Sequence, residues 1–121
     1  MPKRICLIDD EEDFTDITGT LLQFQGYEVK TFNDPRDGLN AVNAGGFDAV
    51  VVDIMMPHMD GLSLMRTLRA GTYGKNPMFA LSAKRLSDED RKFLLTHDIH
   101  FVPKPFEPRR LVELIGKALS T

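Results

Sequence analysis

The chain has 121 residues, of which 42% are apolar and 27% charged, and its formal net charge is −3 at pH 7. This length fits one domain spanning residues 1–121, and the net charge is too small and of the wrong sign to suggest a nucleic-acid surface. The single cysteine, Cys6, excludes an intramolecular disulfide and a two-cysteine metal site. Because the sequence has neither a signal peptide nor an apolar run of the ~20 residues that span a membrane, we expect a cytoplasmic protein.

Short apolar runs alternate with segments of helical period along the whole chain. Runs that are apolar throughout are typical of strands buried on both faces of a parallel sheet. The run at 27–32 alternates between polar and apolar side chains instead, which favours a strand at the sheet edge. In chain order, the expected strands cover residues 4–9, 27–32, 47–53, 78–82 and 99–102.

The first expected helix follows the acidic stretch after residue 9. Phe14, Ile17, Leu21 and Phe24 recur at helical spacing and predict its buried face. Gly26 then follows as a stop signal, because glycine readily adopts the backbone conformation that ends helices.

Capping residues mark the start of three further helices. Asp34 before a proline predicts the second helix, Ser87 with Asp90 three residues on resembles a capping box, and Pro108 opens the last helix. Five alternating strands and helices predict an α/β fold, with a parallel sheet covered on both faces. The apolar residues expected to face the sheet in the second, third and last helices are Leu39, Val42, Leu62, Met65, Leu68, Leu111, Leu114, Ile115, Ala118 and Leu119.

Polar side chains lie at or just after the ends of four expected strands. These residues are Asp9 and Asp10, Asp53, Ser82, and Lys104. Each alone has an ordinary explanation: an acidic helix start for the aspartate pair, a turn former, a satisfied hydroxyl and a surface charge. Because the carboxyl ends of parallel strands form the ligand-binding edge of such sheets, their shared position favours a functional site.

These residue types suit a hard cation and a phosphoryl group. Mg²⁺ takes oxygen ligands and is usually held by one or two carboxylates together with phosphate oxygens. A carboxylate can also act as a nucleophile and form an aspartyl phosphate. Lys104 and the Ser82 hydroxyl could neutralise charge on the transferred phosphoryl group.

Four segments together resemble the receiver domains of two-component signal transduction systems, over essentially the whole chain. Residues 51–61 resemble the phosphoacceptor segment, 7–11 the acidic pair, 81–83 the hydroxyl position and 104–106 the lysine with its following proline. The resemblance implies a flavodoxin-like (βα)5 three-layer sandwich, with five parallel strands in the order 2-1-3-4-5.

The resemblance also implies a Mg²⁺ site and a phosphoacceptor. Asp53 would accept the phosphoryl group. Asp10 and Asp53 would bind Mg²⁺ directly, Asp9 would act largely through water, and the backbone carbonyl of Met55 would be a further ligand.

Four further residues receive roles by resemblance. Lys104 would pair with the phosphoryl oxygens, and the Lys104–Pro105 bond would be cis. Ser82 would hydrogen-bond the phosphoryl group, and Phe101 would be the aromatic switch that turns inward as Ser82 moves.

By the same resemblance, the phosphoryl donor would be a histidine kinase or histidine phosphotransfer protein docking near the first helix. A downstream output domain or protein, or a second copy of the chain, would bind the face formed by the fourth helix, fifth strand and fifth helix. No membrane or direct nucleic-acid contact is expected, and the domain would be a regulator that promotes only its own phosphorylation and dephosphorylation.

Three other classes of protein fit the residue pattern less well. An aspartyl phosphohydrolase usually has a second acid two residues after its nucleophile, where this chain has Met55. A receiver-like module that is never phosphorylated would not need all five active-site residues. A nucleotide-binding flavodoxin-like protein would need a glycine-rich helix start, whereas Gly45 and Gly46 precede a strand.

Four residues depart from the common receiver pattern. His97 and Asp98 replace a frequent Gly-Ala pair, so the resemblance does not determine the geometry of the turn before the fifth strand. Phe101 replaces the commoner tyrosine and has no phenolic hydroxyl. Met55 lies where a polar side chain often positions hydrolytic water, so we expect slow self-dephosphorylation.

Overall fold

Five parallel strands form the central sheet of the computed structural model, which describes residues 2–56, 59–70, 76–83, 85–104 and 107–120. The strand order, β2-β1-β3-β6-β7, is the predicted 2-1-3-4-5 arrangement, and β2 lies at an edge as its alternating sequence indicated. The strands are β1 (Arg4–Ile8), β2 (Glu28–Phe32), β3 (Ala49–Asp53), β6 (Met78–Ser82) and β7 (Ile99–Pro103).

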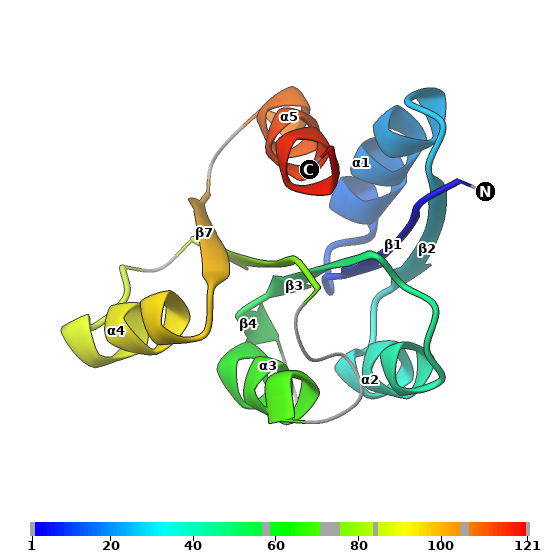
Figure 1. Cartoon of the computed structure of the whole chain (residues 1–121). Coiled ribbons are helices and arrows are strands. Elements are labelled where there is room, and N and C mark those ends of the chain that lie inside the picture. Colours follow the sequence, from blue (N-terminus) through cyan, green and yellow to red (C-terminus); the bar gives the residue numbers. More distant parts are fainter. Residues whose placement is uncertain (1, 57–58, 71–75, 84, 105–106, 121) are drawn as a thin grey trace.

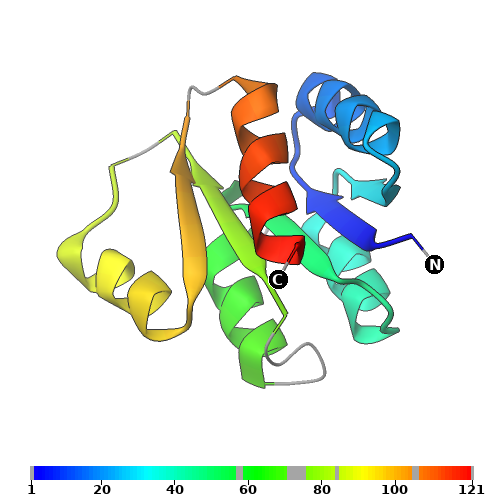
Figure 2. The ribbon, with the colours of Figure 1, turned by 45° about the horizontal axis from the view of Figure 1, so that its top comes forward.

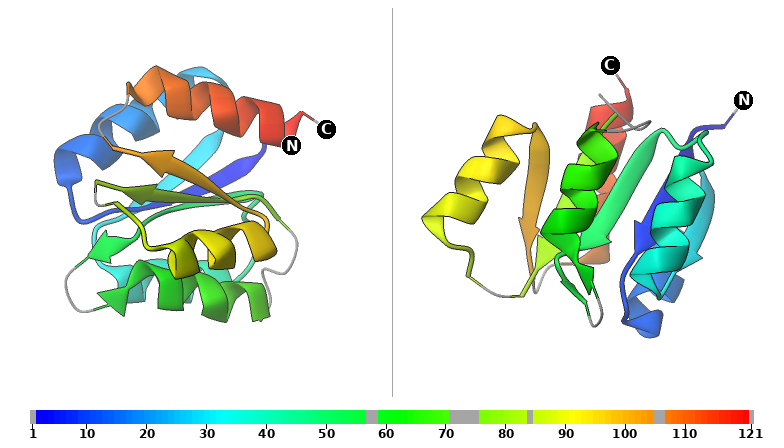
Figure 3. Two further views of the ribbon diagram at one scale, coloured as in Figure 1. Left: turned by 90° about the vertical axis from the view of Figure 1, so that its left-hand side faces the viewer. Right: turned by 90° about the horizontal axis from the view of Figure 1, so that it is seen from below.

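Helices cover both faces of this sheet and complete the predicted three layers. Figure 1 shows α1 and α5 on one face, with α2, α3 and α4 on the other. Figure 2 shows α5 and α1 side by side, and Figure 3 shows the layers edge-on. Among the described residues, no helix is long and apolar enough to cross a bilayer. The helices are α1 (Glu12–Phe24), α2 (Pro35–Asn43), α3 (Gly61–Ala70), α4 (Asp88–Thr96) and α5 (Pro108–Leu119).

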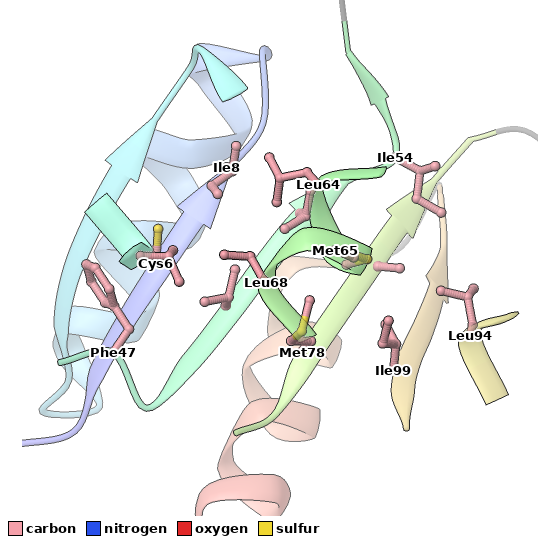
Figure 4. Close-up of a cluster of buried hydrophobic side chains, with 14 of the residues drawn as sticks. Cys6, Ile8, Phe47, Ile54, Leu64, Met65, Leu68, Met78, Leu94 and Ile99 are labelled. Carbon is pink, nitrogen blue, oxygen red and sulfur yellow. The ribbon is translucent and has the colours of Figure 1, made fainter. Parts of the chain in front are cut away.

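The hydrophobic core lies in two clusters, one on each face of the sheet. Successive side chains of a strand point to opposite faces. In β1, Cys6 and Ile8 therefore pack towards α2 and α3, whereas Ile5 and Leu7 pack towards α1 and α5. Figure 4 shows the first cluster, in which Met65 of α3 contributes one of the buried side chains. Burial on both faces explains why the central strands are apolar throughout.

Helix α1 differs from its predicted buried face. Ile17 is 56% exposed and Phe24 is 82% exposed, whereas Thr15, Thr18 and Leu22 are buried. The helix is therefore rotated relative to the expected apolar stripe, and its contacts with β1, β2 and α5 decide which side is covered. The expected end of the helix is confirmed, because Gly26 follows it with a φ of 97°.

Side-chain caps begin α2 and α4 as predicted. The Asp34 carboxylate accepts a hydrogen bond from the Arg36 backbone N–H at 2.8 Å, with a proline at the first helical position. The Ser87 hydroxyl accepts from the Asp90 backbone N–H at 3.1 Å. Pro108 is the first residue of α5, also as predicted.

The turn before β7, whose geometry the resemblance left undetermined, is formed by His97 and Asp98. Asp98 adopts a positive φ of 54°, a conformation that aspartate tolerates better than most residues. The Arg69 guanidinium of α3 donates to the backbone carbonyls of His97 at 3.0 Å and Asp98 at 3.2 Å. These two hydrogen bonds hold the turn against α3.

A short antiparallel hairpin after β3 was not predicted. It consists of β4 (Met55–Met56) and β5 (Met59–Asp60) and leads directly into α3. The expected cis bond before Pro105 lies outside the described residues.

Replacing either of two helical glycines with alanine should change the free energy of unfolding in opposite directions. A Cβ on Gly38 of α2 would lie 2.5 Å and 2.6 Å from two side-chain atoms of buried Ile8, whereas one on Gly116 of α5 would lie 3.7 Å from the Tyr27 hydroxyl. We predict that Gly38→Ala lowers the free energy of unfolding by about 1–2 kcal/mol, because overpacking outweighs helix propensity. Gly116→Ala should raise it by up to about 1 kcal/mol. Urea unfolding of both variants measures this, and equal effects would contradict the close packing of α2 on β1.

Candidate functional site

The predicted polar residues meet at the carboxyl-terminal edge of the sheet. Asp9 follows β1, Asp53 ends β3, Ser82 ends β6 and Lys104 follows β7. The side chains of Asp9, Asp53 and Ser82 are almost completely buried, with exposed fractions of 1%, 4% and 1% for the residues. Burying polar groups is costly unless they have partners. The clustering of three buried polar side chains therefore indicates a functional site at this edge of the sheet.

Three carboxylates form a possible cation site at this edge. One oxygen from each of Asp9, Asp10 and Asp53 lies within 4.8 Å of the other two. Opposite oxygen ligands of Mg²⁺ are roughly 4.2 Å apart, from a bond length of about 2.1 Å, so a small inward movement would let these oxygens share the ion. Asp10 is exposed and can make such a movement. The residues therefore fit a hard divalent cation, which would also relieve their mutual repulsion.

The Lys104 ammonium is the positive charge among these carboxylates. Its Nζ lies 2.9 Å from Asp9 Oδ2, 2.9 Å from Glu11 Oε1 and 3.5 Å from Asp53 Oδ2. Burial alone lowers the pKa of Lys104, but its hydrogen bonds and charge interactions with Glu11, Asp9 and Asp53 outweigh burial and raise the pKa above its ordinary value. Lys104 is therefore charged at neutral pH.

Asp9 is fixed in place from several sides. Its Oδ1 accepts from the Glu11 backbone N–H at 2.9 Å, and its own backbone carbonyl accepts from the Asn33 side chain at 2.7 Å. Burial raises the pKa of the Asp9 carboxyl, although the hydrogen bonds from Glu11 and Lys104 lower it in part. A bound cation would favour the charged carboxylate further.

Backbone hydrogen bonds connect the strand ends that carry the site. The Lys104 backbone N–H donates to the Ser82 carbonyl at 2.7 Å, and the Ile54 N–H donates to the Leu81 carbonyl at 2.8 Å. The ends of β3, β6 and β7 are thereby held next to one another. Ser82 is thus positioned beside Lys104 through the main chain.

The other two predicted residues lie near this edge. Met55 begins β4, two residues after Asp53, and the role of its carbonyl remains a prediction. Phe101 is half-buried in β7, opposite Ala80 of β6, and packs against the core cluster beneath α3 and α4.

The sequence did not predict two contacts of Lys104. Glu11 belongs to an acidic stretch whose local pattern indicates only a helix start. Phe14 was expected in the core, yet the Lys104 ammonium lies 5.0 Å from the centroid of its ring, a cation–π distance. Both contacts join residues that lie about ninety positions apart in the sequence, and Glu11 and Lys104 are separated by 93. A local sequence pattern therefore cannot indicate them.

Removal of the Lys104 charge should destabilise the protein in the absence of divalent cations. We predict that Lys104→Met lowers the free energy of unfolding in EDTA by about 3 kcal/mol, because it leaves a buried carboxylate uncompensated. Added Mg²⁺ should stabilise this variant more than it stabilises the wild type. Urea unfolding with and without Mg²⁺ measures both effects, and the exposed Lys92→Met serves as the control. A Lys104→Met protein as stable as wild type in EDTA would contradict the proposed charge balance.

Comparison with known proteins places this chain in a family. Residues 5–116 match the response regulator receiver domain model. The response regulator MprA of Mycolicibacterium vanbaalenii is 35% identical over 112 residues, which are 93% of this chain and 48% of that protein. The chain spans about half the length of the curated relatives that it matches.

Solved structures agree with this assignment. A CheY-like receiver domain from Methanospirillum hungatei superposes with a TM-score of 0.89 at 29% identity, covering 99% of this chain and 95% of that one. The BeF3-activated receiver domain of DrrB, from Thermotoga maritima, gives 0.85 at 26% identity, with complete coverage of both chains. The chain belongs to the response regulator receiver domains of two-component systems.

Proposed function

We propose that the domain accepts a phosphoryl group on Asp53 in a Mg²⁺-dependent reaction and thereby controls a partner or output domain. The observation that carries this proposal is the position of the Asp53 carboxylate. It is 4% exposed, shares a cation-sized cluster with Asp9 and Asp10, and lies 3.5 Å from the Lys104 ammonium. A nucleophile and the groups that neutralise a phosphoryl charge are thus brought together.

In the proposed reaction, an oxygen of the Asp53 carboxylate attacks the phosphorus of the donor. A new P–O bond forms, and the bond between phosphorus and the leaving group breaks with its electron pair going to the leaving group. Lys104 donates to the phosphoryl oxygens, and the Ser82 hydroxyl is a further donor from the end of β6. Asp10, Asp53 and the Met55 carbonyl would hold Mg²⁺ directly and Asp9 largely through water, and the ion would further neutralise the phosphoryl charge.

The proposed switch begins with Ser82 and Phe101. A phosphoryl group on Asp53 adds negative charge and acceptor oxygens, which favours a state with Ser82 drawn towards it. Phe101 lies on the neighbouring strand and is only half-buried, so an inward turn would bury more of its ring. The expected surface change lies on α4, β7 and α5.

The proposed partners follow from the family. A histidine kinase or histidine phosphotransfer protein supplies the phosphoryl group by docking near α1, in the cytoplasm. An output domain or separate protein, or a second copy of the chain, binds the face formed by α4, β7 and α5. Residues 1–121 act as one receiver domain that catalyses no reaction beyond its own phosphorylation and dephosphorylation, and any contact with nucleic acid belongs to an output domain.

Intact-mass measurement tests the phosphoacceptor. After incubation with acetyl phosphate and Mg²⁺, we expect one added phosphoryl group on the wild type. None should appear on Asp53→Asn or on wild type treated with EDTA. No addition to any sample would support the unphosphorylated module instead. Release of inorganic phosphate from many small phosphomonoesters, with rapid turnover, would support a phosphohydrolase.

The role of Phe101 is tested by NMR with beryllium fluoride as a phosphoryl mimic. In the wild type, adding it with Mg²⁺ should change amide shifts at the site and along α4, β7 and α5. In Phe101→Ala, the site should respond while the distant face does not. Phe32→Ala, which removes a half-buried ring at the other edge of the sheet, should respond like the wild type. A full response in Phe101→Ala would exclude the switch role.

A further inference from the structure

Carboxylates accept hydrogen bonds from two of the N–H donors of the Lys104 ammonium. An ammonium has three N–H donors. Two of its contacts are hydrogen bonds of 2.9 Å to Asp9 and Glu11, and the third, to Asp53, is longer at 3.5 Å. A phosphoryl group on Asp53 that accepts more than one of the three donors must therefore displace Asp9 or Glu11 from the ammonium.

Glu11 is the partner that can be released most easily. Its side chain is 65% exposed, so water can replace the ammonium as its hydrogen-bond partner. Asp9 is 1% exposed and is also held by the Glu11 backbone N–H. Losing the ammonium would leave the Asp9 carboxylate buried with less compensation, which is costly.

We infer that Glu11 is a positioning residue that competes with the phosphoryl group for Lys104 and restrains phosphorylation. This inference rests on the proposed role of Asp53. In the unmodified protein, Glu11 draws the ammonium towards the start of α1, and it releases the ammonium when the phosphoryl group arrives. Its negative charge also repels the incoming anion at short range, which acts in the same direction.

Phe14 keeps Lys104 near the site when Glu11 is absent. The ammonium lies 5.0 Å from the ring centroid, and this contact does not involve the Glu11 side chain. Together with the retained hydrogen bond to Asp9, it holds the lysine close to Asp53. Replacing the Glu11 carboxylate with a neutral amide should therefore weaken the hold on one N–H donor without misplacing the lysine side chain.

The rate of phosphorylation by acetyl phosphate tests this competition. We expect Glu11→Gln to acquire the phosphoryl group roughly two- to fivefold faster than the wild type, the range that the loss of one exposed ion pair supports. Glu12→Gln is the matched control. Glu12 is the neighbouring acid, is exposed, and makes no ion pair with Lys104 within the described part of the chain. Its rate should stay close to that of the wild type, because an exposed charge at longer range is screened by salt.

A second measurement needs neither phosphorylation nor metal. In EDTA, ¹⁵N NMR of the Lys104 ammonium reports the exchange of its protons with water. Exchange should be faster in Glu11→Gln than in the wild type, because the neutral amide oxygen of glutamine accepts a weaker hydrogen bond than the carboxylate, and unchanged in Glu12→Gln. Unaltered exchange in Glu11→Gln would show that the Glu11 contact does not hold the ammonium and would overturn the inference.

The rate outcomes separate this inference from the proposed function. If the wild type is phosphorylated on Asp53 but Glu11→Gln reacts at the same rate or more slowly, Glu11 does not compete for Lys104 and only this inference fails. If Glu11→Gln and Glu12→Gln are both phosphorylated faster by the same factor, the cause is the reduced negative charge near the site. The inference then also fails. If the wild type takes up no phosphoryl group, the proposed function itself fails.

Discussion

The contact between the Lys104 ammonium and the carboxylates around it is the interaction on which this molecule depends. Burial of apolar strands on both faces brings the ends of β1 and β3 together, and with them Asp9 and Asp53. Without a cation, like charges so close together would favour separation of the strands or protonation of a carboxyl. Lys104, which follows the edge strand β7, reaches across to Asp9 at 2.9 Å and supplies that cation from within the chain. The fold and the charge balance of the site therefore require each other.

The Lys104 ammonium also has a part in the proposed switch between two states of the domain. An ammonium with three donors cannot serve every carboxylate and a phosphoryl group equally, so the proposed phosphoryl group on Asp53 would redistribute its hydrogen bonds. Lys104 is bonded through its main chain to Ser82 and follows the strand that carries Phe101. A change at Asp53 thus has a short physical route, through Ser82 and β7, to the surface beside α4 and α5. The difference between the two states in their interaction free energy with the phosphoryl group would set how far their populations shift.

Much of the fold was predictable because its signals are local. The Asp34 and Ser87 caps involve residues two or three positions apart, and the apolar strands reflect burial on both faces. The clustering of Asp9, Asp10 and Asp53 was also predictable, since a parallel sheet brings equivalent strand ends together. What failed depends on tertiary contacts. The packing of α1 against its neighbours leaves Ile17 and Phe24 exposed despite their helical spacing, and the Glu11–Lys104 pair joins opposite ends of the chain. The hairpin of β4 and β5 is too short to produce a periodic signal.

The central claim is that Asp53, among several neighbouring carboxylates, is the residue that carries the phosphoryl group. Identification of the modified residue tests this most directly. The phosphorylated protein is reduced with borohydride, which converts an acyl phosphate to the corresponding alcohol, and the peptides are sequenced by mass spectrometry. We expect homoserine at position 53 and unmodified aspartate at positions 9 and 10. Homoserine at position 9 or 10, with aspartate retained at position 53, would contradict this claim.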